Sequence, residues 1–75
     1  MIILSQDEHQ VINSNLVQMF WVTKNGEMYV VGMDLGNSPD SGIKLGEYET
    51  EEEALKELDL IFYNLSNNAN SYTMK

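Results

Sequence analysis

A chain of 75 residues with 43% hydrophobic residues predicts one small domain (residues 1–75) with a hydrophobic core rather than a disordered segment. It has no cysteine and one histidine, His9, which excludes disulfides, thiolate metal sites and multi-histidine metal sites. Twelve acidic residues against four lysines give a net charge of −8, which argues against direct binding to DNA or RNA.

The first residues lack the features of a signal peptide. Residues 1–4 are apolar, but Asp7 and Glu8 follow closely, whereas a signal peptide needs a basic start and a longer apolar segment. No apolar run approaches the roughly 20 residues of a membrane span. We therefore expect a cytoplasmic protein with no membrane partner.

The first two thirds of the chain predict short strands joined by polar turns. Runs rich in β-branched and aromatic residues alternate with clusters of Asn, Ser, Asp and Gly, which favour turns. A loop with the single proline is expected at residues 36–42. The expected strands are residues 2–6, 9–13, 16–24, 27–35 and 43–48.

The clearest local signal is the Asn-Gly pair at residues 25–26. This dipeptide suits a type I′ turn, whose twist matches that of a β-hairpin. With these two residues as the turn, Lys24 lies opposite Glu27 and Trp21 lies opposite Val30. The sequence therefore predicts a hairpin in this register.

In that register, both faces of the hairpin are rich in apolar side chains. An antiparallel sheet that is covered on one side should instead alternate apolar with polar residues. One helix is available to cover one face, so the second face is either additional core or an interface with another protein or a second copy of the chain. The residues of this predicted interface are Val17, Met19, Trp21, Met28 and Val30.

A helix is predicted over residues 51–66. Thr50 and Glu53 have the spacing of a capping box, and the acidic residues at the start suit the positive end of the helix dipole. Residues 71–75 are expected to form a short edge strand or a loose tail. Apolar residues at helical spacing form one stripe that should pack on the sheet: Ala54, Leu55, Leu58, Ile61, Phe62 and Leu65. The predicted fold is α+β: an antiparallel β-meander of four to five strands packed on one C-terminal amphipathic helix.

Acidic residues are dense between residues 47 and 59, where Lys56 is the one cation. One interpretation is a solvated helix start that is favoured by the helix dipole. The other is a docking face that attracts a partner with a basic surface. The residues of this predicted acidic docking face are Glu49, Glu51, Glu52 and Glu53.

The sequence shows no pattern typical of catalysis. A lone His9 offers no nucleophile and base pair, and residues 34–40 do not match a calcium-binding loop. The glycines are scattered and do not form a phosphate-binding loop. We expect no enzymatic activity, no cofactor and no metal ion.

Four stretches in this order resemble a family of short uncharacterised proteins of Gram-positive bacteria and their phages and prophages. They are Met-Ile-Ile-Leu-Ser-Gln-Asp at residues 1–7, Val-Ile-Asn at 11–13, the strand-to-helix block at 43–52, and Tyr-Thr-Met at 72–74. The resemblance covers nearly the whole chain, and the block at 43–52 is its most specific part. It implies a mobile-element setting, and hence a host cytoplasm, in which small inhibitors and accessory proteins are common.

Together these features predict a non-enzymatic protein-interaction module, in its sharpest form an inhibitor that docks on a larger host or defence protein. Its partner is expected to be another protein, with homo-oligomers also expected. The alternative is a protein that binds or sequesters a small molecule, such as a nucleotide or metabolite, between the sheet and the helix. A structural or accessory subunit of a phage particle is also compatible with the sequence.

Overall fold

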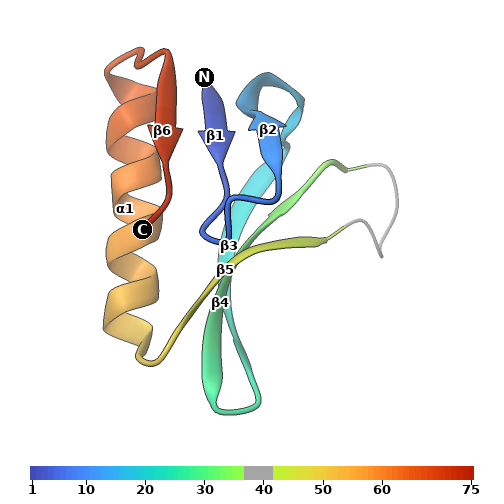
Figure 1. Cartoon of the computed structure of the whole chain (residues 1–75), viewed down its shortest axis with the longest axis vertical. Helices are drawn as coiled ribbons and strands as arrows, with labels where there is room; N and C mark the ends of the chain where they lie inside the picture. Colours follow the sequence, from blue (N-terminus) through green and yellow to red (C-terminus); the bar gives the residue numbers. More distant parts are fainter. Residues whose placement is uncertain (37–41) are drawn as a thin grey trace.

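The computed structural model describes residues 1–36 and 42–75, and it confirms the predicted α+β class (Figure 1). The loop predicted at residues 36–42 lies almost wholly outside the described residues. A 3-10 turn, Ser14–Leu16, precedes β3, and helix α1 spans Glu51–Ser66. The strands are β1 (Ile2–Leu4), β2 (Val11–Asn13), β3 (Met19–Asn25), β4 (Met28–Asp34), β5 (Ile43–Tyr48) and β6 (Ser71–Thr73).

Strands β3, β4 and β5 form an antiparallel meander against which α1 packs. The first two strands do not continue this meander, although the sequence predicts that they open it. They belong to a second sheet with the strand order β2-β1-β6, in which β1 is antiparallel to β2 and parallel to β6. Ile3 lies between Ile12 and Tyr72 in this sheet, so the two ends of the described chain are joined there.

The β3–β4 hairpin has a different register from the predicted one. Asn25 pairs with Met28, so the turn residues are Gly26 and Glu27. Gly26 has a φ of 65°, whereas Asn25 and Glu27 do not have positive φ. This is the pattern of a type II′ turn, which needs glycine at its first central position. The predicted type I′ turn and its Lys24–Glu27 pair are therefore wrong, but a shift of two residues leaves every side chain on its predicted face.

The core lies between the two sheets and α1. Both sheets and the helix contribute to it, and Phe20 and Val22 of β3 pack against it as partly buried neighbours. Since Phe20 stands on the edge strand of the meander, the core ends close to that residue. The buried members are Ile3, Ile12, Val31, Met33, Leu45, Tyr48, Ala54, Ile61 and Met74.

On the opposite face of the meander, the indole ring of Trp21 lies across β4. A Cβ atom at Gly32 would overlap this ring, and a Cβ atom at Gly42 would lie 3.3 Å from it. A bulge between β4 and β5 also brings Lys44 and Glu47 to one face, where they form an ion pair. Without the bulge, residues three apart in a strand would point to opposite faces. This face is thus partly covered by side chains of the chain itself.

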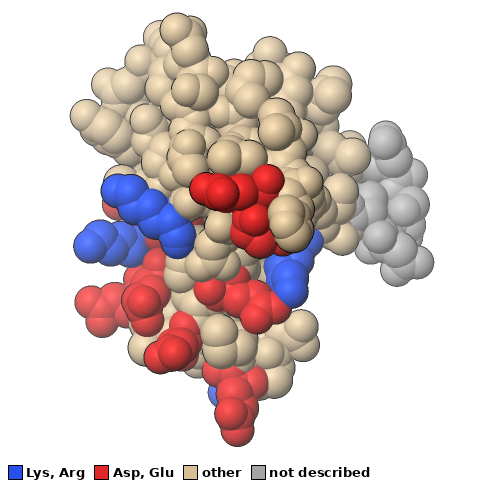
Figure 2. Space-filling view, viewed as in Figure 1, with Lys and Arg blue, Asp and Glu red and all other residues tan. Residues whose placement is uncertain are grey.

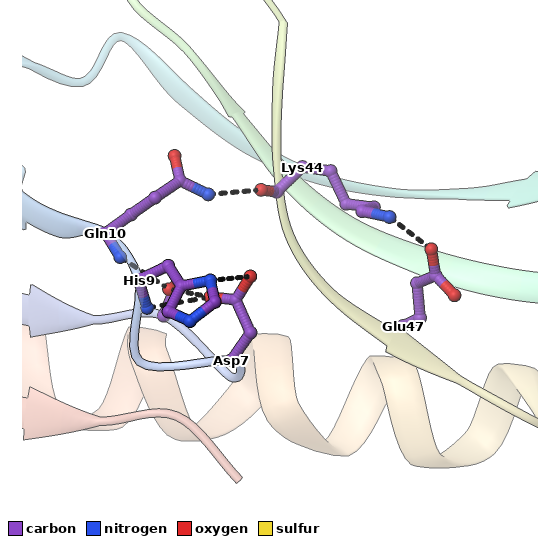
Figure 3. A network of polar contacts seen from close by, with 6 residues as sticks. Asp7, His9, Gln10, Lys44 and Glu47 are labelled. Carbon is purple, nitrogen blue, oxygen red and sulfur yellow. Dashed lines mark hydrogen bonds and ion pairs between the residues drawn. The ribbon is translucent and has the colours of Figure 1, made fainter.

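Two glutamine side chains close the free edge of β5 and join the two sheets, and Figure 3 shows the contact made by Gln10. The backbone N–H of Gln6 donates to Leu45 O at 3.0 Å, and its side chain bonds both the N–H and the C=O of Glu47, at 2.6 and 3.0 Å. Gln10 Nε2 donates to Lys44 O at 3.1 Å. The side chains thus take the place of a neighbouring strand, which protects this edge from pairing.

The turn that carries both glutamines is held by Ser5 and Asp7. Asp7 Oδ1 accepts hydrogen bonds from the backbone N–H of His9 at 3.0 Å and from Ser5 Oγ at 2.7 Å. Ser5 Oγ accepts in turn from Gln10 N at 3.1 Å. The hydrogen bond from His9, followed by that from Ser5, lowers the pKa of Asp7. His9 itself is exposed and lies beside Asp7 as part of this turn (Figure 3).

Helix α1 begins at its predicted cap. Thr50 Oγ1 accepts a hydrogen bond from the backbone N–H of Glu53 at 3.2 Å and donates to its carboxylate at 3.1 Å. At the other end, Asn67 bonds Tyr63 O through both its backbone and its side chain. The observed bounds of α1 agree with the predicted residues 51–66 because both ends are set by local capping.

Candidate functional site

The apolar stripe of α1 is only partly buried. Ala54 and Ile61 lie in the core, whereas Leu55, Phe62 and Leu65 are 47%, 67% and 37% exposed. The prediction that the whole stripe packs on the sheet is therefore wrong. The three exposed side chains are among the largest apolar groups of the helix. They lie beside the buried face of the helix rather than on it.

The face of α1 that is buried differs from the predicted apolar stripe, because it includes Glu57. At roughly 100° per residue, Glu57 lies on the same side as Ala54 and Ile61, and its side chain is 3% exposed. Its carboxylate accepts hydrogen bonds from Tyr72 Oη at 2.7 Å and from the backbone N–H of Lys75 at 2.6 Å. These bonds satisfy a buried charge, and they leave one side of the apolar stripe outside the core.

The Tyr72 hydroxyl bonds this buried carboxylate, and Tyr48 is close enough to be affected by its charge. Burial, followed by the charge of Glu57, raises the pKa of Tyr48 well above its usual range. Burial, followed by the hydrogen bond to Glu57, does the same for the pKa of Tyr72. The Tyr48 hydroxyl is buried and has no hydrogen-bond partner among the described residues. The contacts of Glu57 therefore fasten the segment around β6 to α1.

The exposed side of the helix forms a groove with the edge of the meander. We call it the α1 groove, and its apolar lining consists of Phe20 from β3 with Leu55, Leu58, Ile61, Phe62 and Leu65 from α1. Glu52, Lys56 and Asp59 also line it and bring charge to an otherwise apolar surface. A continuous exposed apolar surface with a polar border is typical of a binding site for another macromolecule.

Strand β3 stands at the edge of the meander beside this groove. Its one strand neighbour in the described part of the chain is β4. Since Asn25 and Met28 close the turn, every second residue back along β3 bonds to β4, and the residues between them direct their N–H and C=O groups outward. The outward-facing residues are Phe20, Val22 and Lys24. Within residues 1–36 and 42–75, no backbone hydrogen bond reaches this outer edge.

The residues of the predicted sheet interface do not form one exposed patch. Val17 packs against the core, and Val30 is buried. Met19 is 53% exposed at the start of β3, Met28 is half-buried at the opposite end of the hairpin, and Trp21 between them covers β4. Binding through this face stays a prediction, but the face offers less apolar surface than its sequence suggests.

The residues of the predicted acidic docking face lie together at the start of α1. Glu49, Glu51, Glu52 and Glu53 are all exposed. Figure 2 shows acidic side chains gathered over the lower half of the molecule, where α1 begins, whereas the upper half of this view is nearly free of charge. Glu52 also lines the α1 groove, so the acidic helix start adjoins the apolar surface.

Other kinds of site find little support in residues 1–36 and 42–75. These residues contain no group of three or more His, Asp or Glu side chains placed to hold a metal ion. No helix among them has the length and hydrophobicity needed to cross a membrane. Most of residues 34–40, whose sequence does not match a calcium-binding loop, lie outside the described residues.

Comparison of the chain with protein-family models, with curated proteins and with solved structures finds no significant match.

Sequence reasoning missed the α1 groove because it assigned the whole stripe to the core. One signal was present, because Glu57 falls at i+3 from Ala54 and at i−4 from Ile61, inside the buried face. A carboxylate there indicates either a polar partner in the core or a shifted burial face. The density of acidic residues around Glu57 favoured the solvated interpretation. Its partners, Tyr72 in β6 and Lys75 just after that strand, cannot be predicted from a helical pattern.

Proposed function

We propose that this chain is a non-enzymatic protein-binding module. In this proposal, the α1 groove holds an apolar segment of a larger protein, and the acidic start of α1 attracts basic residues that flank the segment. The observation that carries it is the exposure of Leu55, Phe62 and Leu65 on one side of a helix that packs its other side on the meander.

Exposed apolar side chains of this size cost little in isolation, but several together are typical of interfaces. Phe62 stands at 67% exposure between Leu55 and Leu65 along the stripe and contacts the same groove as Phe20. Aromatic side chains of this kind supply much of the energy of protein–protein binding when they become buried. Burial of Phe62 and its neighbours would therefore provide affinity.

The charges around the groove indicate the chemistry of the partner. Two carboxylates, Glu52 and Asp59, line it with one cation, Lys56. Glu51 and Glu53 lie beside Glu52, and the whole chain carries a net charge of −8. Such a field speeds association with a basic partner and disfavours an acidic one. The sharper form of the proposal is an inhibitor of a host or defence protein, which is supported by the family resemblance of the sequence.

Affinity capture with quantitative mass spectrometry tests the proposal in a Gram-positive host lysate. Phe62→Asp should remove the captured partner, because a carboxylate in the groove would have to be desolvated. Tyr63→Ala is the matched control, because Tyr63 is a neighbouring aromatic residue that is 61% exposed but does not line the groove. Reversal of Glu51 and Glu53 to lysine should weaken capture mainly at low salt.

A purified captured protein should then bind the chain in solution with the same order of variants. If Phe62→Asp and Tyr63→Ala capture the same proteins in the same amounts as the unmodified chain, the groove is not the binding surface. Circular dichroism and thermal unfolding of each variant separate a loss of binding from a loss of fold.

A further inference from the structure

We infer that the segment bound in the α1 groove is an extended strand that pairs with the open edge of β3. This inference rests on the proposed function and specifies its partner: a segment of alternating apolar residues that is flanked by Lys or Arg. The added strand would become the fourth strand of the β3-β4-β5 sheet.

The backbone of β3 supplies the first argument. Phe20, Val22 and Lys24 direct their N–H and C=O groups away from β4, and no backbone group of the described residues bonds to them from outside. Unpaired edges of this kind are the templates on which peptide strands add to sheets. The strand spans Met19–Asn25, which is long enough for several pairs of backbone hydrogen bonds.

The other long edge of the meander is already closed. Gln6 and Gln10 bond the backbone of β5 at Leu45, Glu47 and Lys44, as described above. The same sheet therefore has one edge that is protected by its own chain and one edge that is not. An open edge beside an apolar groove is consistent with binding of a partner strand, because exposed edges that have no binding role promote aggregation.

The position of α1 supplies the second argument. The side chains of Phe20 and Val22 face the core, and α1 packs on that face of the meander. A strand added beside β3 would place every second side chain on this same face. Those side chains would fill the α1 groove against Leu55, Phe62 and Leu65, which line it together with Phe20.

Charge favours a separate partner over a second copy of this chain. Two copies would bring together net charges of −8 and −8, and at the contact each copy would place two carboxylates, Glu52 and Asp59, against one cation, Lys56. A segment flanked by Lys or Arg would instead bring opposite charge to these carboxylates. The occupant that fits best is thus a basic strand with alternating apolar residues.

Two displayed libraries of peptides about ten residues long provide the test, because strand and helix modes need different apolar spacings. One library alternates Val, Ile or Phe with Thr and carries Lys at both ends. The other has the same composition with its apolar residues at helical i, i+3 and i+4 spacing. The alternating library should yield the binders. Each binder is then resynthesised with N-methyl groups on alternate amides, in both phases, and measured by fluorescence anisotropy.

If the inference is right, one N-methyl phase weakens binding by about tenfold or more, because it removes the hydrogen bonds to β3, while the other phase is tolerated. Phe62→Asp should abolish binding, and Tyr63→Ala should not change it. In NMR spectra, the amides of Phe20, Val22 and Lys24 should acquire the small temperature coefficients of hydrogen-bonded groups. The amides of Trp21 and Thr23, which already bond to β4, should not change.

Three results would overturn the inference. Binders from the helical library that tolerate both N-methyl phases would refute strand addition but leave the proposed groove in place. Failure of both libraries to yield a binder that depends on Phe62 would count against the strand mode. A dimer in light scattering that dissociates with Phe62→Asp would show that a second copy occupies the groove, and both proposals would then fall.

Discussion

The buried carboxylate of Glu57 gives the sharpest test of this structure. Glu57→Gln keeps the shape of the side chain but replaces one acceptor oxygen with an amide that can only donate. The two donors that face it are Tyr72 Oη at 2.7 Å and the backbone N–H of Lys75 at 2.6 Å. The tyrosine hydroxyl can rotate to accept from the new amide, whereas a backbone N–H cannot. At best, two charge-assisted hydrogen bonds become two neutral ones.

The expected loss follows from the difference between these bonds. Hydrogen bonds to a charged group contribute about 1.5–3 kcal/mol and neutral ones about 0.5–1.5 kcal/mol. Glu57→Gln should therefore lower the free energy of unfolding by about 1–3 kcal/mol. At about 0.05–0.15 kcal/mol per residue, a chain of 75 residues has a free energy of unfolding of roughly 4–11 kcal/mol. The expected loss is a large part of this total and should be measurable.

Urea denaturation followed by circular dichroism measures this loss as a shift of the midpoint at constant slope. Glu51→Gln is the matched control, since Glu51 is exposed on the same helix, and it should change stability by about 0.5 kcal/mol or less. A double-mutant cycle with Tyr72→Phe should give a coupling energy of about 0.5 kcal/mol or more. If Glu57→Gln is as stable as Glu51→Gln and the cycle shows no coupling, Glu57 does not lie on the buried face of α1.

Three further changes test other parts of the fold. Gly32→Ala should force the Trp21 ring off β4 and lower the free energy of unfolding by about 1–3 kcal/mol. The tryptophan fluorescence should shift to the red, and unchanged fluorescence would contradict the described packing. Thr50→Ala should cost about 1 kcal/mol through loss of the helix cap, and a neutral result in urea denaturation would argue against it. Burial raises the pKa of Tyr48 and Tyr72 above the ordinary tyrosine value of 10. Their contribution to the free energy of unfolding should therefore be full below about pH 10 and be lost as the pH rises through their pKa values in the folded protein. An ultraviolet titration that finds both tyrosines at the ordinary pKa would refute this.

Features that depend on neighbours in sequence were predictable. The bounds of α1 follow from Thr50 and from the polar segment that starts at Asn67, and the structure has the helix where these residues place it. The faces of the β3–β4 hairpin also follow from alternation. Its register does not, because Gly26 can serve in a type I′ turn as the second central residue or in a type II′ turn as the first. Local sequence did not decide between these turns.

Features that depend on distant residues were not predictable. Ile3 pairs with Tyr72 across nearly the whole chain, and no periodicity in either segment indicates the other. The same pairing brings Tyr72 to Glu57, turns the helix and exposes Leu55 and Phe62. The candidate site was missed for this reason. Its residues were recognised as apolar, but their exposure is set by a contact between the helix and the last strand.

The parallel pairing of β1 with β6 also has a consequence for how this chain folds during synthesis. Residues Ile2–Leu4 are synthesised long before Ser71–Thr73, yet the two segments are neighbours in the sheet. The loop between these strands must close late, and contacts of such long sequence separation slow folding. The hairpin of β1 and β2, three residues in each strand, is too short to be stable alone. The second sheet should therefore form only after β6 has been synthesised, so the core that it helps to enclose should close late in folding.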